Sequence, residues 1–163
     1  MQPPKTLDII VPCYNPRGGW ENEIADSVEK LKKLLPVDGL RTVILVNDGS
    51  ILRVDEKRLE GLAERVPELK VIAYSKNQGK GHAVRMGVSS SEADLQIYTD
   101  VDFPYEEASI AGFYDTLANN ETDVVVASRG ETYYRSLSWF RRVLSKSLRW
   151  LNGLLFGLSI KDT

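Results

Sequence analysis

The chain of 163 residues contains a single cysteine, Cys13, and a single histidine, His82. One cysteine excludes an intrachain disulfide and favours a reducing compartment. So few thiol and imidazole groups also exclude a Cys/His zinc site, and a Ser-His-Asp or Cys-His catalytic arrangement would have to use His82. The N-terminal segment lacks a signal-peptide pattern, and no apolar run approaches the roughly 20 residues of a membrane span. We therefore expect a cytoplasmic protein.

A strong excess of charge is also absent, because 21 basic residues are balanced by 23 acidic ones and the net charge is −2. The chain as a whole is therefore not expected to bind nucleic acid. Hydrophobic residues make up 42% of the sequence, which is ordinary for a globular protein and excludes disorder as the main state. At this length we expect one domain, residues 1–163.

Short β-branched runs alternate with longer amphipathic segments along the chain. The runs predict strands at residues 7–12, 41–46, 70–74, 95–99 and 123–128, and their continuous apolar character is typical of strands covered on both faces. The amphipathic segments predict helices at residues 21–35, 55–66, 80–91 and 105–120. This alternation indicates an α/β fold with a mostly parallel sheet between two layers of helices.

Each predicted strand is followed at once by a polar motif. In chain order these motifs are "PCYNP", "NDGS", "SKNQGKG", "TDVD" and "SRG". The carboxyl ends of parallel strands meet at one edge of a sheet, where ligands bind in open α/β folds. The five motifs therefore predict one shared binding site.

Asp100 and Asp102 stand two residues apart directly after the fourth predicted strand. Two carboxylates on one face of a strand repel each other, and a divalent cation bound beside them would relieve that repulsion. The alternative is a pair of solvated acidic residues that begin a loop without further function.

The second and third motifs each allow a functional and a purely structural interpretation. "VNDGS" is favoured turn chemistry, yet Asp48 is also suited to accept hydrogen bonds from a nucleobase or ribose. "NQGKGHAVRMG" matches neither a P-loop nor a dinucleotide fingerprint, but Lys80 at a helix N-terminus could meet a phosphate. Otherwise it marks a helix start with an exposed lysine.

The stretch at residues 139–156 predicts an amphipathic helix with an apolar half and a basic half. One interpretation is a helix that packs on the sheet with its basic face solvated. The other is an interfacial helix that makes a peripheral contact with an anionic membrane surface. Arg141 and Ser145 are neighbours on its polar edge, which suits the binding of a phosphate.

Taken in order, "VPCYNP", "VNDGS", "NQGKGHAVRMG", "TDVD", "ASR" and "IKDT" resemble inverting family-2 glycosyltransferases of GT-A fold. The third and last of these motifs most resemble polyprenyl- or dolichyl-phosphate glucose and mannose synthases. The resemblance implies a three-layer α/β/α fold and hexose transfer from a UDP- or GDP-hexose to a polyprenyl phosphate. It further implies Mg²⁺ or Mn²⁺, a place at the cytoplasmic face of the membrane, and a role in cell-envelope glycan synthesis.

The same resemblance implies roles for individual residues. Asp100 and Asp102 would bind the metal, Asp48 the base or ribose, and Arg129, Arg141 and Ser145 the phosphates of donor or acceptor. The nucleotide-sugar site would comprise Pro12, Tyr14, Asn15, Asp48, Lys80, Asp100 and Val101, and the catalytic residues would be Lys80, Asp102 and Arg129. The family usually has an acidic residue at the position of Pro16 and continues past "KDT", so we expect a truncated catalytic domain.

Two other classes remain open. Sugar-1-phosphate nucleotidyltransferases also bind nucleotides and Mg²⁺ on an α/β sheet, but they have a glycine-rich loop with arginine after the first strand. Here that loop is "PCYNPRGGW", with its glycines at other positions. A non-catalytic nucleotide-binding module is the second alternative.

Overall fold

The computed structural model describes residues 4–119, 122–127, 147, 148 and 150. Contacts divide the chain into two compact units, Met1–Asp123 and Val124–Thr163. The sheet, the helices and the site described below all belong to the first unit. The expected single domain over residues 1–163 stays a prediction.

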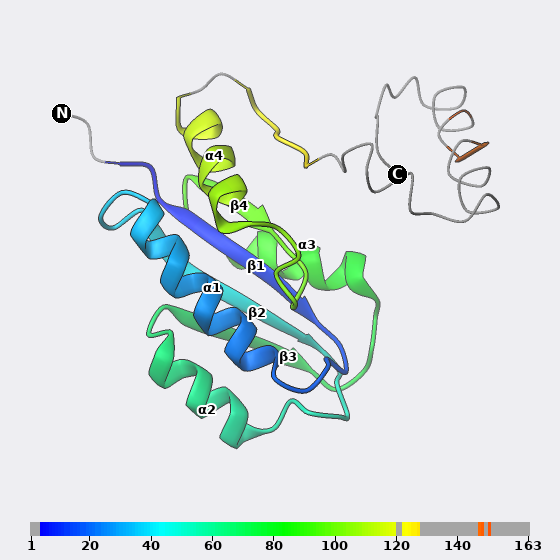
Figure 1. Ribbon diagram of the computed structural model, residues 1–163. Helices are drawn as coiled ribbons and strands as arrows, with labels where there is room; N and C mark the ends of the chain where they lie inside the picture. The colour runs from blue at the N-terminus through cyan, green and yellow to red at the C-terminus, as the bar shows by residue number, and fades with distance from the viewer. Residues whose placement is uncertain (1–3, 120–121, 128–146, 149, 151–163) are drawn as a thin grey trace. The chain divides into compact units, whose positions relative to one another are not determined.

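The first unit is built on a four-stranded parallel sheet (Figure 1). Its strands are β1 (Leu7–Cys13), β2 (Leu40–Asp48), β3 (Leu69–Tyr74) and β4 (Leu95–Tyr98), in the spatial order β3-β2-β1-β4. Ile9 and Ile10, which point to opposite faces of β1, are both fully buried. The continuous apolar run in this strand therefore reflects cover on both faces, as the sequence predicted.

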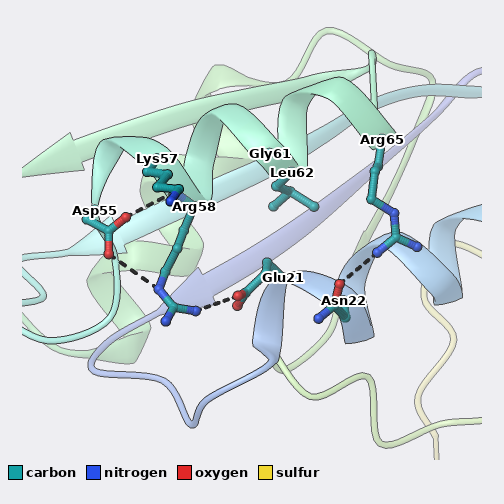
Figure 2. A pocket seen from close by; sticks show the side chains of 8 residues that line it. All are labelled: Glu21, Asn22, Asp55, Lys57, Arg58, Gly61, Leu62 and Arg65. Carbon is teal, nitrogen blue, oxygen red and sulfur yellow. Dashed lines mark hydrogen bonds and ion pairs between the residues drawn. The ribbon is translucent and has the colours of Figure 1, made fainter.

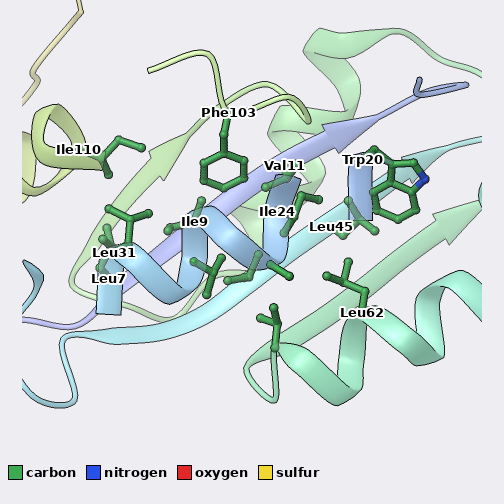
Figure 3. Packing of buried hydrophobic residues seen from close by; sticks show 14 of the residues in the cluster. Leu7, Ile9, Val11, Trp20, Ile24, Leu31, Leu45, Leu62, Phe103 and Ile110 are labelled. Atoms are coloured by element: carbon green, nitrogen blue, oxygen red, sulfur yellow. The ribbon is translucent and has the colours of Figure 1, made fainter. Parts of the chain in front are cut away.

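Helices form a layer on each face of the sheet (Figure 1). On one face lie α1 (Trp20–Leu34), α2 (Glu56–Arg65) and α4 (Glu107–Ala118), and α3 (Lys80–Ser90) packs on the other. Figure 3 shows the larger core, where Ile24 and Leu31 of α1 pack with Leu62 of α2 and Ile110 of α4. The predicted three-layer α/β/α fold is confirmed.

Helix α3 approaches the sheet closely because it carries glycine at the contact. A Cβ atom at Gly87 would lie 2.4 Å from Cγ2 of Ile10 and 3.3 Å from Cγ2 of Val46. With Ile44 and Ala83, these two side chains form the smaller core on this face. The close packing fixes α3, and therefore its N-terminal residue Lys80, relative to the ends of the strands.

The strand order creates a crevice next to β1. From β1 the chain moves outward through β2 to β3, and then returns to place β4 on the other side of β1. The connections after β1 and β2 lead to helices on one face of the sheet, whereas the connection after β3 crosses the other face on its way to β4. In α/β sheets this change of direction is where ligands bind.

The predicted strand at residues 123–128 is wrong within the described part of the chain. Residues 122–127 form no strand there, and Val124 and Val126 are each 70% exposed. A strand is stabilised by a hydrogen-bonded neighbour and by burial of its apolar side chains. Val124 and Val126 lack that burial, so the β propensity of the run alone does not produce a strand.

The predicted helix at residues 139–156 lies mostly outside the described residues. Ser147, Leu148 and Trp150, which are described, have helical conformation. None of the described helices is long and apolar enough to cross a membrane.

Candidate functional site

A cavity of about 550 Å³ opens at the carboxyl ends of β1 and β4. Every predicted site residue within the described part of the chain lines it: Pro12, Tyr14, Asn15, Asp48, Lys80, Asp100, Val101 and Asp102. These residues come from four separate strand-end motifs, so the structure gathers them into one site. Their individual roles stay predictions. Arg129, Arg141 and Ser145 lie outside the described residues.

Asp48, at the end of β2, holds the loop between β3 and α3. Its side chain is 2% exposed, and one oxygen accepts a hydrogen bond from the Gln78 backbone N–H at 2.8 Å. The other oxygen accepts from the Gly79 N–H and from the Asn77 side-chain amide, both at 2.9 Å. Asp48 is therefore first of all the anchor of this loop.

Gly49 allows the same two loops to meet. Its φ of 70° lies in the left-handed region, and a Cβ atom there would lie 2.6 Å from the Asn77 backbone nitrogen. A side chain at this position would push away the loop that Asp48 anchors. The Asp-Gly pair in "NDGS" thus forms a turn and also holds the loop between β3 and α3 in place.

Asp100 and Asp102 lie on a tight turn just beyond the end of β4, and not on the strand itself. The Phe103 N–H donates to the Asp100 carbonyl at 3.0 Å, which closes the turn. Phe103 adopts a φ of 40°, and its side chain is buried in the larger core. The buried ring therefore fixes the turn and leaves both carboxylates at the cavity.

Lys80, the first residue of α3, forms an ion pair with Asp100 across the cavity. Its Nζ atom also lies 5.9 Å from the centre of the Tyr98 ring, within the range of a cation–π contact. The side chains of Lys80 and Asp100 are 56% and 49% exposed, so the pair is well solvated. One of the two predicted metal ligands thus already has a cationic neighbour.

The donor atoms at this turn fit a hard divalent cation. Within the part of the chain that the structure describes, no group of three or more His, Cys, Asp and Glu side chains could hold a metal by itself. Mg²⁺ and similar ions are commonly held by one or two carboxylates, with substrate phosphates and water completing the shell. Asp100 and Asp102 suit that kind of site, in which phosphate oxygens of a ligand and water would complete the coordination of the metal.

Asn15 joins the loops that follow β1 and β2. Its side-chain oxygen accepts from the backbone N–H groups of Ile51 and Leu52, each at 3.0 Å. Its own backbone N–H donates to the Ser50 hydroxyl at 3.0 Å, and its φ is 44°. Asn15 therefore shapes the cavity wall through its side-chain oxygen.

The cavity also includes residues that were not predicted as site residues. They are Cys13, Pro16, Arg17, Trp20, Glu23, Asn77 and Gly79. Cys13, Pro16, Asn77 and Gly79 lie within the quoted motifs, and Arg17 directly follows one of them. Burial raises the pKa of the Cys13 thiol to about 12, so this group stays neutral and is no nucleophile at neutral pH.

A second cavity, of about 470 Å³, lies between α1 and α2 and is rich in charged side chains (Figure 2). Its two arginines are already paired. Arg58 contacts Glu21 and, at 3.3 Å, Asp55, and Arg65 donates to Asn22 at 2.9 Å. These contacts connect the two helices and leave no arginine free for a ligand.

Comparison with known proteins places the chain among sugar transferases. The sequence profile of glycosyl transferase family 2 matches residues 8–159. A human dolichyl-phosphate beta-glucosyltransferase is 29% identical over 172 residues, which cover 99% of this chain and 53% of the relative. A dolichol-phosphate mannosyltransferase of Pyrococcus furiosus is 26% identical, over 86% of this chain and 38% of the relative. The chain thus spans about half the length, or less, of these curated relatives.

The fold has a counterpart among solved structures. A mannosyltransferase from Pyrobaculum calidifontis, solved with GDP-Man and Mn²⁺, superimposes with a TM-score of 0.62 at 22% sequence identity. The match covers 81% of this chain and 38% of that one. At this level of identity the likeness establishes the fold.

Proposed function

The chain belongs to glycosyl transferase family 2, and from this premise we propose that its cavity binds a nucleoside-diphosphate sugar and transfers the hexose to an acceptor. The observation that carries the proposal is the convergence of four strand-end motifs on one cavity with two carboxylates at its edge. The bound GDP-Man and Mn²⁺ of the Pyrobaculum enzyme support a donor of this class and a divalent cation. The names of the dolichyl-phosphate relatives support a polyprenyl phosphate as acceptor.

The cavity residues fall into two groups, one for the nucleoside and one for the diphosphate of the donor. Pro12 near the end of β1, with Tyr14 and Asn15 in the loop that follows this strand, would form the wall for the nucleoside. Asp100 and Asp102 would hold Mg²⁺ or Mn²⁺ beside the diphosphate, where the ion neutralises the charge that grows on the leaving group. Lys80 adds a cation at the N-terminus of α3, an end of a helix that favours phosphate.

The chemistry needs little from the protein beyond position and charge. An oxygen of the acceptor phosphate forms a bond to the anomeric carbon, and the bond from that carbon to the β-phosphate oxygen breaks. The nucleoside diphosphate leaves, and attack from the opposite side inverts the anomeric centre. Because a phosphate acceptor is already anionic at neutral pH, no side chain has to remove a proton. Lys80 would stabilise the leaving diphosphate directly, and Asp102 would do so through the metal ion that it would help to hold.

The test is calorimetry with UDP and GDP in the presence of Mn²⁺, followed by a transfer assay with radiolabelled UDP-glucose or GDP-mannose and a short polyprenyl phosphate. We expect binding of one nucleotide and a labelled lipid product. Exchange of label between a sugar 1-phosphate and a nucleoside triphosphate would instead identify a nucleotidyltransferase. Binding without any transfer would overturn the catalytic part of the proposal in favour of a nucleotide-binding module.

Arg17 is expected to contribute directly to donor binding. It lies on the exposed loop between β1 and α1, lines the cavity and, among the described residues, forms no ion pair. A charge-assisted hydrogen bond to a phosphate is worth about 1.5–3 kcal/mol, so Arg17→Met should weaken nucleoside-diphosphate binding by about tenfold or more. Calorimetry with and without Mn²⁺ should show the loss in both conditions. Arg85→Met removes an exposed cation of α3 outside the cavity and should bind as the wild type does.

A further inference from the structure

Lys80 has two possible partners in the proposed reaction, and it cannot serve both at once. Its ammonium group is paired with Asp100. The proposed donor would place a diphosphate in the same cavity, next to a divalent cation held by Asp100 and Asp102. A cation bound to Asp100 would repel an ammonium group that stays in contact with the same carboxylate.

We propose that Lys80 is an exchangeable counter-ion, which neutralises Asp100 as long as no metal is bound and moves to the diphosphate when the metal binds. This inference rests on the proposed function, because it takes the diphosphate as the second partner of Lys80. It adds a coupling that the function alone does not require. Metal and donor would bind cooperatively. The metal displaces Lys80 from Asp100 and so frees it for the diphosphate, and a bound diphosphate draws Lys80 away and so frees Asp100 for the metal.

The charges around the cavity favour such an exchange. Four acidic side chains line it, Glu23, Asp48, Asp100 and Asp102, against the two cations Arg17 and Lys80. The two oxygens of Asp48 already accept hydrogen bonds from the loop. Without a metal, the remaining acidic groups would therefore oppose a diphosphate, and Lys80 together with Arg17 limits this repulsion.

The exchange needs the movement of one side chain only. The backbone at Lys80 begins α3, and the preceding Gly79 N–H is held by Asp48. The side chain itself is largely exposed, and its long flexible stem ends in three donors that can be redirected. The Tyr98 ring, 5.9 Å from Nζ, offers the ammonium group a second favourable contact at the cavity edge.

Loss of the ammonium group should have opposite effects on Mn²⁺ binding without nucleotide and on nucleotide binding with Mn²⁺. Without nucleotide, Lys80 competes with the metal for Asp100, so Lys80→Met should bind Mn²⁺ more tightly. An exposed ion pair of this kind corresponds to a change of about two- to fivefold. At saturating Mn²⁺, the same variant should bind a nucleoside diphosphate about tenfold more weakly, because it lacks a charge-assisted hydrogen bond. By reciprocity, the factor by which nucleotide improves metal binding falls as well.

The experiment measures free Mn²⁺ by electron paramagnetic resonance in titrations of the protein, with and without UDP or GDP. Lys76→Met is the matched control, because it removes an exposed lysine of the loop before α3 without changing the cavity lining. We expect tighter Mn²⁺ binding in Lys80→Met alone, and near wild-type coupling in Lys80→Arg. Thermal unfolding verifies that each variant is folded.

Unchanged or weaker Mn²⁺ binding by Lys80→Met without nucleotide would overturn the inference. An equal gain in Lys76→Met would also overturn it, because net charge would then explain the effect. Failure of the proposed function would give a different experimental result. In that case neither UDP nor GDP binds to the wild type, while the Mn²⁺ titration without nucleotide still reports whether Lys80 competes for Asp100.

Discussion

Asp102→Asn is expected to weaken Mn²⁺-dependent binding of a nucleoside diphosphate by at least about tenfold. Loss of a supporting residue beside a metal ligand typically lowers metal affinity by about 10- to 100-fold, and loss of a ligand charge should cost no less. Only two carboxylates lie on the turn after β4, and Asp100 is shared with Lys80. The variant would therefore retain a poorly neutralised ion, since the described residues offer no third acidic group beside this pair to replace Asp102.

The loss of nucleotide affinity in Asp102→Asn should disappear or change sign when the metal is removed. In a chelating buffer, Asp102 is only a negative charge close to the diphosphate, so Asp102→Asn should bind nucleotide as well as the wild type or better. Calorimetry with UDP and GDP, in Mn²⁺ and then in chelator, measures the nucleotide affinity with and without metal.

Glu106→Gln is the matched control for this prediction, because Glu106 is exposed, lies four positions further along the chain and does not line the cavity. It should leave both affinities unchanged. Equal affinity of Asp102→Asn and wild type in Mn²⁺ would show that Asp102 does not bind the metal.

Local sequence patterns were sufficient to predict the described helices and four strands. Each of these elements depends mainly on the spacing of apolar residues within it, as in α1, where Ile24, Val28 and Leu31 form the buried face. The order of the strands was not predicted, because pairing of β1 with β4 joins segments far apart in the sequence. The run at 123–128 has the same local pattern as β1, but Val124 and Val126 are exposed.

The location of the candidate site followed from one general rule, that ligands bind at the carboxyl ends of parallel strands. The rule identifies which motifs meet, but it does not say what each side chain contacts. Asp48 illustrates the difference. Its partners are 29 to 31 positions away, and they are mostly backbone N–H groups that carry no sequence signal. For the same reason Asn15, predicted as a nucleotide contact, could not be foreseen as the link between two loops.

The second large effect is expected at Asp48, and it concerns stability before it concerns binding. Asp48→Ala removes the acceptor of three hydrogen bonds that hold the loop from Asn77 to Gly79. Because the lost bonds involve a buried carboxylate and a partly exposed loop, we expect the free energy of unfolding to fall by about 2–4 kcal/mol. Urea unfolding without any ligand measures this loss. A role confined to the base or ribose predicts no such change.

A conservative variant distinguishes the loss of the loop's hydrogen bonds from a simple loss of charge. Asp48→Asn keeps one acceptor oxygen but turns an NH₂ group toward the N–H donors of the loop, so it should lose part of the stability and not all of it. Asp115→Asn, on the exposed side of α4, removes the same charge and should unfold as the wild type does. If Asp48→Ala were as stable as this control, the loop would be held by other contacts. Because Lys80 begins the helix that this loop enters, the destabilised variant should also lose the lysine's effect on Mn²⁺ binding.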